Sequence, residues 1–357
     1  MASAVHCRDL PFMKCICSFG VTLFLLASPF LARADTANDS VTQMDNLWLR
    51  AESNPTANAT AAEQTAFNKA RLGILKDTAT QAHDFAENNP GNPAARHAKK
   101  IEALATLSQA QLGDVGSEPR ALRLGYVFRQ DLQNDEGDRF EVAARMMEYS
   151  IGQKQLPASQ LMGEYEKRAD GLVAEFPKHA GVYNIYLGLM RISSVVDARR
   201  MATKVLVSPA DSTVKDQAKD ILAQLDLVGT RPEIEFTAVD GTQFQLKDQL
   251  GKIVVFYIWT SQSQEVAQVF TAVRQNTSGA TLVGVNIDQD PAAAAGAAAR
   301  SGAPGIQYSD TRGLKGPLPQ QLKVQQVPSV YVFRADGTLA GFGAVSDLAR
   351  LTASASR

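Results

Sequence analysis

Hydrophobic side chains recur at helical spacing through most of the chain and at strand spacing near its end. Between residues 35 and 228, apolar positions return every three or four residues, separated by short breaks rich in proline, glycine or asparagine. Thr60 and Glu63 have the spacing of a capping box and predict the start of the first long helix. We expect antiparallel helical pairs, arranged either as a short α-solenoid or as an irregular bundle. The later helices are predicted at about 137–151, 159–176, 179–206 and 212–227.

In the last third of the chain, the apolar positions fall in short runs of β-branched and aromatic residues, which are typical of strands. The runs 234–238 and 244–246 flank Asp240-Gly241, a pair that favours a hairpin turn. Residues 252–259 are almost wholly apolar. Such a run is typical of a central strand that is buried on both faces.

The central run leads directly into a predicted helix at about 262–276. Ser261 and Gln264 have the spacing of a capping box, and the apolar residues that follow return at helical spacing. We therefore expect Ser263 in the first turn of this helix, where backbone N–H groups have no partner within the helix.

A second buried strand is predicted at 281–287. After it, Asp290 followed by Pro291 predicts the start of another helix, with the aspartate as its cap. Asp288 and Asp290 also look like a fragment of a calcium-binding loop, but the series of ligands does not continue. A helix cap is the simpler interpretation.

The apolar strand, Trp259 and the turn into a helix resemble the redoxin group, the thioredoxin-fold thiol:disulfide oxidoreductases of the bacterial envelope. Members of that group carry Trp-Ala-x-Trp-Cys-x-x-Cys at this point. Aligning Trp259 with the first tryptophan places Ser263 at the attacking cysteine and Val266 at the resolving cysteine. Aligning Thr260 with the Thr-x-x-Cys of the peroxiredoxins (the alkyl hydroperoxide reductase and thiol-specific antioxidant group) again places Ser263 at the reactive cysteine. The resemblance implies a thioredoxin-like scaffold in which the Cys-x-x-Cys has been replaced.

A second landmark of the same family lies near the end of the chain. Val327-Pro328 leads into a predicted strand, and Asp336-Gly337 turns that strand into the next one. In thioredoxin-fold proteins the corresponding proline is cis and faces the redox pair, so the resemblance implies a cis bond before Pro328. The resemblance covers about residues 230–350.

The first 34 residues have the features of a cleavable signal peptide. Lys14 precedes an apolar run over 16–31, and Ala32-Arg33-Ala34 matches the small-x-small cleavage pattern. The run is shorter than the roughly 20 residues that a membrane-spanning helix needs. We expect cleavage after Ala34, export to the periplasm or another site outside the cytoplasm, and no stable membrane insertion afterwards. The predicted architecture is α + α/β: a signal peptide (1–34), a helical domain (35–228) and a thioredoxin-like α/β domain (230–357).

All three cysteines, Cys7, Cys15 and Cys17, precede the predicted cleavage site. A mature chain without thiols cannot carry out thiol–disulfide exchange or reduce peroxide, because both reactions begin at a thiolate. Hydrolysis at Ser263 would need a base within hydrogen-bond reach. No histidine follows His179, so the C-terminal domain offers no histidine for that role.

Charge and composition exclude several other functions. The chain has 36 basic and 37 acidic residues, with neither end strongly basic, so it has no electrostatic signature of nucleic-acid binding. His83 and His97 are too isolated from other ligand types to predict a metal site. No P-loop or dinucleotide-binding motif is present, and we predict neither a metal nor a cofactor.

The function that can survive the loss of cysteine is binding. In the family, the residue before the cis-proline offers its backbone N–H and C=O groups to an extended peptide. We therefore expect a redox-inactive module that binds peptides or proteins in the cell envelope. The residues expected to form the groove are Trp259, Gln262, Ser263, Val327 and Pro328.

Two alternatives remain open. The chain could be an envelope thiol–disulfide oxidoreductase, or a peroxiredoxin-like antioxidant protein, that works with thiols supplied by a partner. It could also be a structural helical-repeat scaffold in which the thioredoxin-like domain only caps the array. The fold alone does not choose among these functions.

Overall fold

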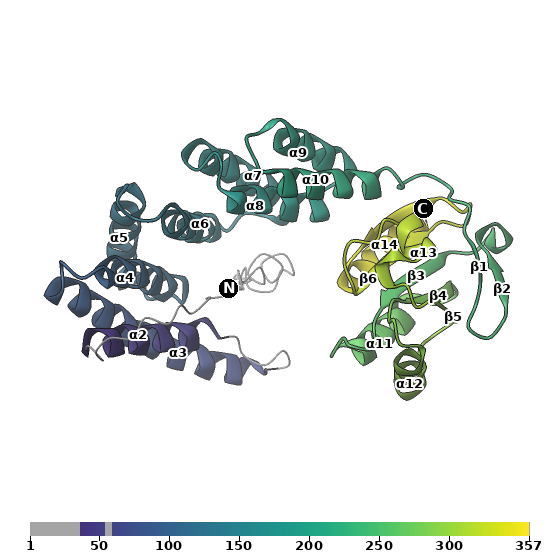
Figure 1. The fold of residues 1–357 in the computed structure, drawn as a ribbon, viewed down its shortest axis with the longest axis horizontal. Helices are drawn as coiled ribbons and strands as arrows, with labels where there is room; N and C mark the ends of the chain where they lie inside the picture. Colours follow the sequence, from purple (N-terminus) through teal and green to yellow (C-terminus); the bar gives the residue numbers. More distant parts are fainter. Residues whose placement is uncertain (1–35, 54–58, 357) are drawn as a thin grey trace, which may run out of the picture. The chain divides into compact units, whose positions relative to one another are not determined.

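The computed structural model describes residues 36–53 and 59–356, which form two compact units (Figure 1). The first unit ends at Tyr186 and the second begins at Leu187. The predicted signal peptide and its cysteines lie outside the described residues.

The helices of the first unit begin and end close to where the hydrophobic spacing predicts. Thr60 forms the predicted capping box: its side chain accepts from the Glu63 N–H, and the Glu63 carboxylate accepts from the Thr60 N–H. Asp135 likewise accepts from the first N–H groups of the helix that it precedes. The helices are α2 (Thr36–Glu52), α3 (Ala61–Asn88), α4 (Ala94–Gln111), α5 (Glu118–Gln130), α6 (Glu136–Gln153) and α7 (Ala158–Glu175), with the 3-10 turn η2 (Val115–Ser117); α8 (Ala180–Ile192) spans the division between the units.

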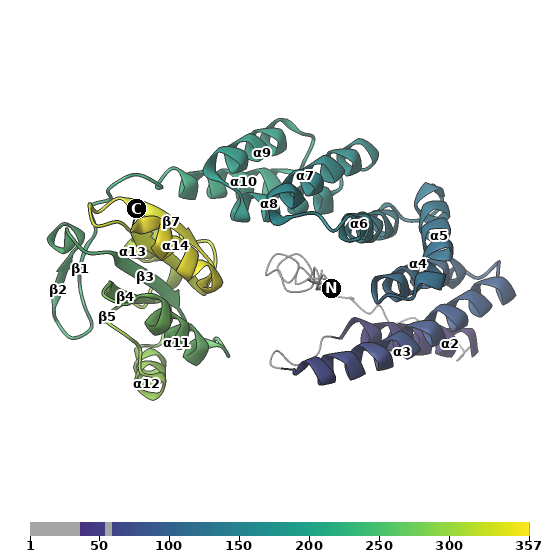
Figure 2. The same ribbon diagram turned by 180° about the vertical axis from the view of Figure 1, so that it is seen from behind.

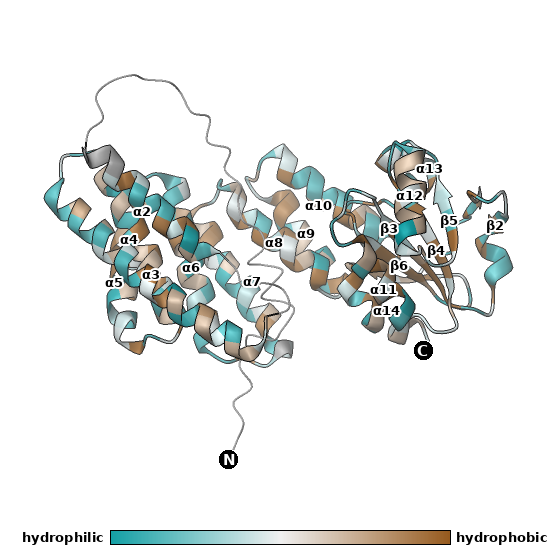
Figure 3. Ribbon diagram, turned by 90° about the horizontal axis from the view of Figure 1, so that it is seen from below, coloured by the Kyte–Doolittle hydropathy of each residue, from teal (hydrophilic) through white to brown (hydrophobic). Residues whose placement is uncertain are grey.

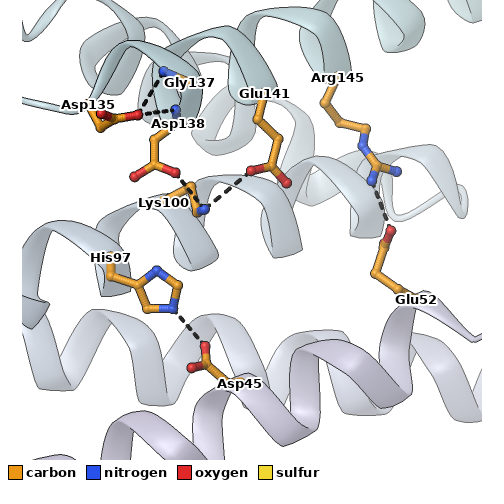
Figure 4. Close-up of polar contacts among 9 residues, drawn as sticks. All are labelled: Asp45, Glu52, His97, Lys100, Asp135, Gly137, Asp138, Glu141 and Arg145. Carbon is orange, nitrogen blue, oxygen red and sulfur yellow. Dashed lines mark hydrogen bonds and ion pairs between the residues drawn. The ribbon is translucent and has the colours of Figure 1, made fainter. Parts of the chain in front are cut away.

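From α2 to α7, each helix packs against the next one along the chain, and α4 also packs against α2 and α6. Polar contacts cross-link these three alternate helices (Figure 4). Packing between alternate helices is a feature of a solenoid, and it favours the short α-solenoid over the irregular bundle. The cross-links are Asp45–His97 (2.6 Å), Glu52–Arg145 (2.9 Å), Lys100–Asp138 (2.7 Å) and Lys100–Glu141 (3.2 Å).

The prediction of one helix over 179–206 is wrong, because this stretch forms α8 and then α9 (Val195–Val207). Ser194 accepts a hydrogen bond from the Asp197 N–H at 3.1 Å and so caps α9. Serine side chains compete with the helical backbone for hydrogen bonds and therefore favour such boundaries. The last helix before the sheet, α10 (Ser212–Leu225), is capped in the same way by Asp211.

The second unit contains a mixed five-stranded sheet in the order β5-β4-β3-β6-β7. Figure 2 shows this unit from behind. β3 pairs in parallel with β4 and antiparallel with β6, so it is the central strand. The predicted hairpin forms a separate sheet of β1 and β2, with Asp240-Gly241 in its turn. The strands are β1 (Glu235–Thr237), β2 (Gln243–Gln245), β3 (Val254–Trp259), β4 (Thr281–Asn286), β5 (Ile306–Ser309), β6 (Ser329–Phe333) and β7 (Leu339–Gly343). The helices around them are α11 (Val266–Asn276), α12 (Pro291–Ser301), α13 (Pro317–Gln321) and α14 (Leu348–Ala355).

Apolar side chains cover both faces of the sheet. One face packs against α11, α12 and α14 through residues such as Phe270 and Leu351. The other packs against the hairpin and α13 through residues such as Phe244 and Leu318. Every residue of β3 is buried, and Figure 3 shows the central strands as hydrophobic ribbon. This arrangement confirms the predicted fold class, a helical part followed by a thioredoxin-like α/β domain.

Hydrogen bonds tie α10 and the segment after it to the sheet. Gln224 of α10 donates to the Tyr331 hydroxyl at 2.9 Å, and both residues are buried. The Gly229 N–H donates to the Leu339 carbonyl at 2.8 Å, and the Leu339 N–H donates to the Thr230 carbonyl at 2.9 Å. These bonds occupy backbone groups of the edge strand β7. The last helix before the sheet ends at Leu225 and the first strand begins at Glu235, whereas the second compact unit begins at Leu187 and contains α9 and α10 as well.

A glycine allows a tyrosine side chain to cross β4. Tyr257, Gly284 and Gln307 are aligned on β3, β4 and β5. The Tyr257 hydroxyl donates to the Pro304 carbonyl at 2.6 Å and accepts from Gln307 Nε2 at 2.8 Å. A Cβ atom on Gly284 would lie 2.5 Å from the Tyr257 hydroxyl and 2.3 Å from Gln307 Oε1. The sheet therefore requires a residue without a side chain at this position.

We predict that Gly284→Ala lowers the free energy of unfolding by about 1–3 kcal/mol, because the added methyl group overpacks the sheet. Urea denaturation followed by circular dichroism measures this loss. Gly188 in α8 is the matched control, because a Cβ there would meet no atom within 4 Å. Gly188→Ala should leave the stability unchanged or raise it by up to about 1 kcal/mol. Equal stability of the two variants would contradict the account of Gly284.

Candidate functional site

The residues predicted to form a binding site lie on two segments at one end of the sheet. The first segment is the loop that follows Trp259, the last residue of β3, and the second leads into β6. Ile258 lies opposite Ser329, so one further step along this antiparallel pair sets Pro328 beside Trp259. The Val327-Pro328 peptide bond is cis, as the resemblance implies. The register of the sheet thus brings the two segments together.

The five predicted binding residues differ in their exposure. Trp259 is only 2% exposed and packs edge-on against Phe270, with ring centroids 5.1 Å apart. Within the described residues, its Nε1 has no hydrogen-bond partner. Trp259 can therefore support the loop from inside the apolar layer but offers little surface of its own. The other four differ too. Partly buried are Ser263, Val327 and Pro328, whereas Gln262 is exposed.

The helix after β3 begins at Val266, later than the predicted start at 262. The predicted capping box of Ser261 and Gln264 is not formed, because Glu265 is the N-cap residue and makes no side-chain cap bond. Ser263 lies before the helix, and its Oγ accepts a hydrogen bond from the Glu265 N–H at 3.3 Å. The helix cannot begin earlier because the first residues of the loop are hydrogen-bonded to a carboxylate. This carboxylate lies in the segment that follows β4, the strand next to β3.

That carboxylate belongs to Asp288, which lies just beyond β4 and is 6% exposed. It accepts hydrogen bonds from the Thr260 hydroxyl, from the Ser261 N–H at 2.9 Å and from Asn286 Nδ2 at 2.8 Å. Burial acts to raise the pKa of Asp288, but the hydrogen bonds from Thr260, Asn286 and Ser261 outweigh it and hold the pKa below its ordinary value of 3.8. Asp288 is therefore an ionised anchor for the start of the loop.

The two aspartates after β4 have different roles. Asp290 accepts from the Ala292 N–H at 2.9 Å and caps α12, as predicted. Asp288 was not predicted to be a partner of the loop. The pattern that could have indicated it is Asn286-Ile287-Asp288, because alternation along an extended chain puts the two polar side chains on the same face.

Within residues 36–53 and 59–356, no three His, Cys, Asp or Glu side chains are grouped closely enough to hold a metal ion. Across the same residues, no helix combines the length and apolar character needed to cross a bilayer. The four predicted binding residues that solvent can reach are uncharged: the polar Gln262 and Ser263 and the apolar Val327 and Pro328.

No family model matches the chain, and no curated protein matches it. Solved structures resemble about a third of it, and three of them illustrate the likeness. A protein from Chlorobium tepidum assigned as the thiol:disulfide interchange protein DsbE is 20% identical, with 36% of this chain and 97% of that chain aligned and a TM-score of 0.33. A secreted Mycobacterium tuberculosis disulfide oxidoreductase homologous to E. coli DsbE is 21% identical, over 34% of this chain and 95% of that chain, with a TM-score of 0.29. The MTB protein dsbF is 21% identical, over 35% of this chain and 99% of that chain, with a TM-score of 0.30. Likenesses this low carry no argument about activity, and the fold assignment rests on the strand order and register described above.

We predict that Asp288→Asn, which removes the charge but keeps one oxygen acceptor, destabilises the protein in a pH-dependent way. Because the folded-state pKa of Asp288 lies below 3.8, its ionised form stabilises the folded state above that pH, and this stabilisation is lost as the pH falls through the lowered value. Near neutral pH the variant should lose about 1–3 kcal/mol of unfolding free energy. The difference from the wild type should shrink under strongly acidic conditions. Urea denaturation across a pH series measures both, and a difference that does not change with pH would contradict the anchor.

Proposed function

We propose that the chain is an exported, redox-inactive thioredoxin-like protein that binds peptides or proteins in the bacterial cell envelope. The observation that carries this proposal is the position of Ser263. It lies between β3 and α11, four residues after Trp259, which the register of β3 with β6 sets beside Pro328, and its hydroxyl accepts from the Glu265 N–H. In this proposal Ser263 and Val266 occupy the positions of the two redox cysteines.

Neither residue can replace a cysteine chemically. A serine hydroxyl is ionised far less readily than a thiol, and valine cannot form a mixed disulfide or resolve one. Ser263 is also unsuited to hydrolysis, because its oxygen accepts from a backbone N–H and no histidine follows residue 179 in the sequence. These facts support a role in binding rather than in catalysis.

The site keeps what an extended peptide would need. Backbone groups of Val327 and Pro328 lie at the end of the antiparallel pair β3–β6, where further strand-like hydrogen bonds can form. Gln262 and Ser263 border the same end of the sheet. The absence of charged side chains among these residues fits recognition of the peptide backbone and of uncharged side chains. Export follows from the predicted signal peptide and is part of the proposal.

We predict that the wild-type protein does not reduce insulin disulfides, and that Ser263→Cys with Val266→Cys creates an internal disulfide. The Val266 N–H lies 3.3 Å from the Ser263 carbonyl, so the two residues are one turn apart at the helix start. This spacing suits the Cα separation of about 4.4–6.8 Å that a disulfide requires. Mass spectrometry after oxidation and alkylation counts the free thiols in a chain whose three natural cysteines are replaced by serine.

The single variant Ser263→Cys in the same cysteine-free chain is the control. It has no internal partner and should be alkylated completely. If the double variant is also alkylated completely after oxidation, then residues 263 and 266 do not correspond to the redox pair. Insulin reduction by the wild type would instead favour the oxidoreductase alternative with partner-supplied thiols.

We predict that Ser263→Tyr weakens the binding of an unfolded polypeptide by about tenfold or more, because in this proposal the added ring would occupy the place of the bound peptide. The probe is a reduced and carboxymethylated globular protein with a fluorescent label, since it has no thiol and no stable fold. Fluorescence anisotropy gives the dissociation constant. Gln268→Tyr, on an exposed position of α11 beyond the loop, is the matched control and should bind like the wild type.

The competing functions give different results in this experiment. If the wild type and Ser263→Tyr bind the probe equally well, the probe binds elsewhere on the protein. That result would favour the helical-repeat scaffold. A wild type that fails to bind the probe would contradict the proposed peptide-binding function.

A further inference from the structure

The loop after β3 depends on a single side chain from outside it. Thr260 binds Asp288 through its hydroxyl, and Ser261 binds it through its N–H at 2.9 Å. Thr260 in turn organises the residues that follow: its Oγ1 accepts from the Gln262 N–H at 3.3 Å, and its carbonyl accepts from the Ser263 N–H at 3.2 Å. The two loop residues of the candidate site are therefore placed by Thr260, and Thr260 is placed by Asp288.

Asp288 is itself held in place by a residue of the sheet. Asn286, the last residue of β4, is 3% exposed and donates to Asp288 from Nδ2 at 2.8 Å. It also accepts from the Asp288 N–H through Oδ1 at 3.0 Å, so the two residues bind each other twice. A buried carboxylate is costly unless its oxygens are hydrogen-bonded, and here the donors are supplied from both sides. Asp288 thus connects a rigid strand to an otherwise solvent-facing loop.

We infer that Asp288 is a positioning residue for the peptide-binding groove: it orders the loop over residues 260–265 before a partner arrives. This inference rests on the proposed function. A loop that is ordered in advance loses less conformational freedom on binding, so the affinity is higher than for the same side chains on a mobile loop. The partner touches Gln262 and Ser263, while Asp288 acts from behind them through Thr260.

The test measures binding of the same labelled, carboxymethylated polypeptide to the full chain and to four variants. Asp288→Ala and Thr260→Val should each weaken binding tenfold or more, the second without removing a charge. Asp288→Asn keeps an acceptor for the Ser261 N–H and should recover most of the affinity, to within about threefold of the wild type. Asp310→Asn is the matched control. Asp310 is also shielded and accepts from the Tyr308 hydroxyl at 3.0 Å, but its contacts lie outside this loop.

Amide hydrogen exchange distinguishes positioning from a general loss of stability. In Asp288→Ala and Thr260→Val, exchange should accelerate at residues 261–265 while the amides of β6 keep the protection they have in the wild type. Equal acceleration in β6 would mean that Asp288 only stabilises the whole domain, and this would overturn the inference.

The binding results separate the two proposals. If the wild type binds the probe and Asp288→Ala binds it equally well, the positioning role is wrong and the proposed function stands. If the wild type does not bind the probe, both the proposed function and the positioning role are wrong. Binding that is weakened in Asp288→Ala and recovered in Asp288→Asn supports both.

Discussion

The burial of β3 on both faces is the constraint on which the rest of the second unit depends. All six of its residues are buried, and each neighbouring strand supplies hydrogen bonds, so the strand must be apolar to be stable there. Tyr257 satisfies this requirement only because its hydroxyl reaches across Gly284 to polar groups at β5. The chain first leaves the apolar layer at Thr260. The position of the candidate site is therefore set by where the apolar run ends, and the two segments meet there because β6 is paired with β3.

Three backbone N–H groups of the loop after β3 are already hydrogen-bonded at this end of the sheet. In a thiol oxidoreductase, free N–H groups at the start of the helix stabilise a thiolate. Here the N–H of Ser261 binds Asp288, that of Ser263 binds Thr260 and that of Glu265 binds the Ser263 hydroxyl. The loop consequently holds its form through these hydrogen bonds, including those to the ionised Asp288, with no need for an anion at residue 263.

Local signals in the sequence predicted most of the fold. Capping at Thr60, the turn at Asp240-Gly241 and the cap at Asp290 depend on residues within a few positions of each other, and all three are confirmed. The break before α9 was missed because apolar spacing continues across it, and the local signal is the Ser194 side chain, which caps the start of α9.

The start of α11 shows why the details of the site could not be predicted in the same way. Ser261 has the spacing of a helix cap, yet its N–H is bound to Asp288, which lies far along the chain and approaches only once β3 and β4 are paired. The sequence predicted which segments meet at the site, but it did not predict the hydrogen bonds between Asp288 and the loop. A tertiary hydrogen bond to a buried carboxylate outweighed a local capping preference, because leaving a buried charge without donors costs more than losing a cap.

Helix α10 is hydrogen-bonded to β6, one of the two strands that lead to the candidate site. Gln224 binds the hydroxyl of Tyr331, and Tyr331 lies on β6, the strand that Pro328 precedes. The residues after α10 also contribute to the core, since Leu227 and Val228 pack against the apolar layer on this face of the sheet. A thioredoxin-like domain cut at the change from helix to strand would expose that layer and leave the Tyr331 hydroxyl without its partner. The strand that presents the cis-proline is thus held by the last helix of the N-terminal part, and the sequence boundary near residue 229 marks a change in secondary structure rather than an end of packing.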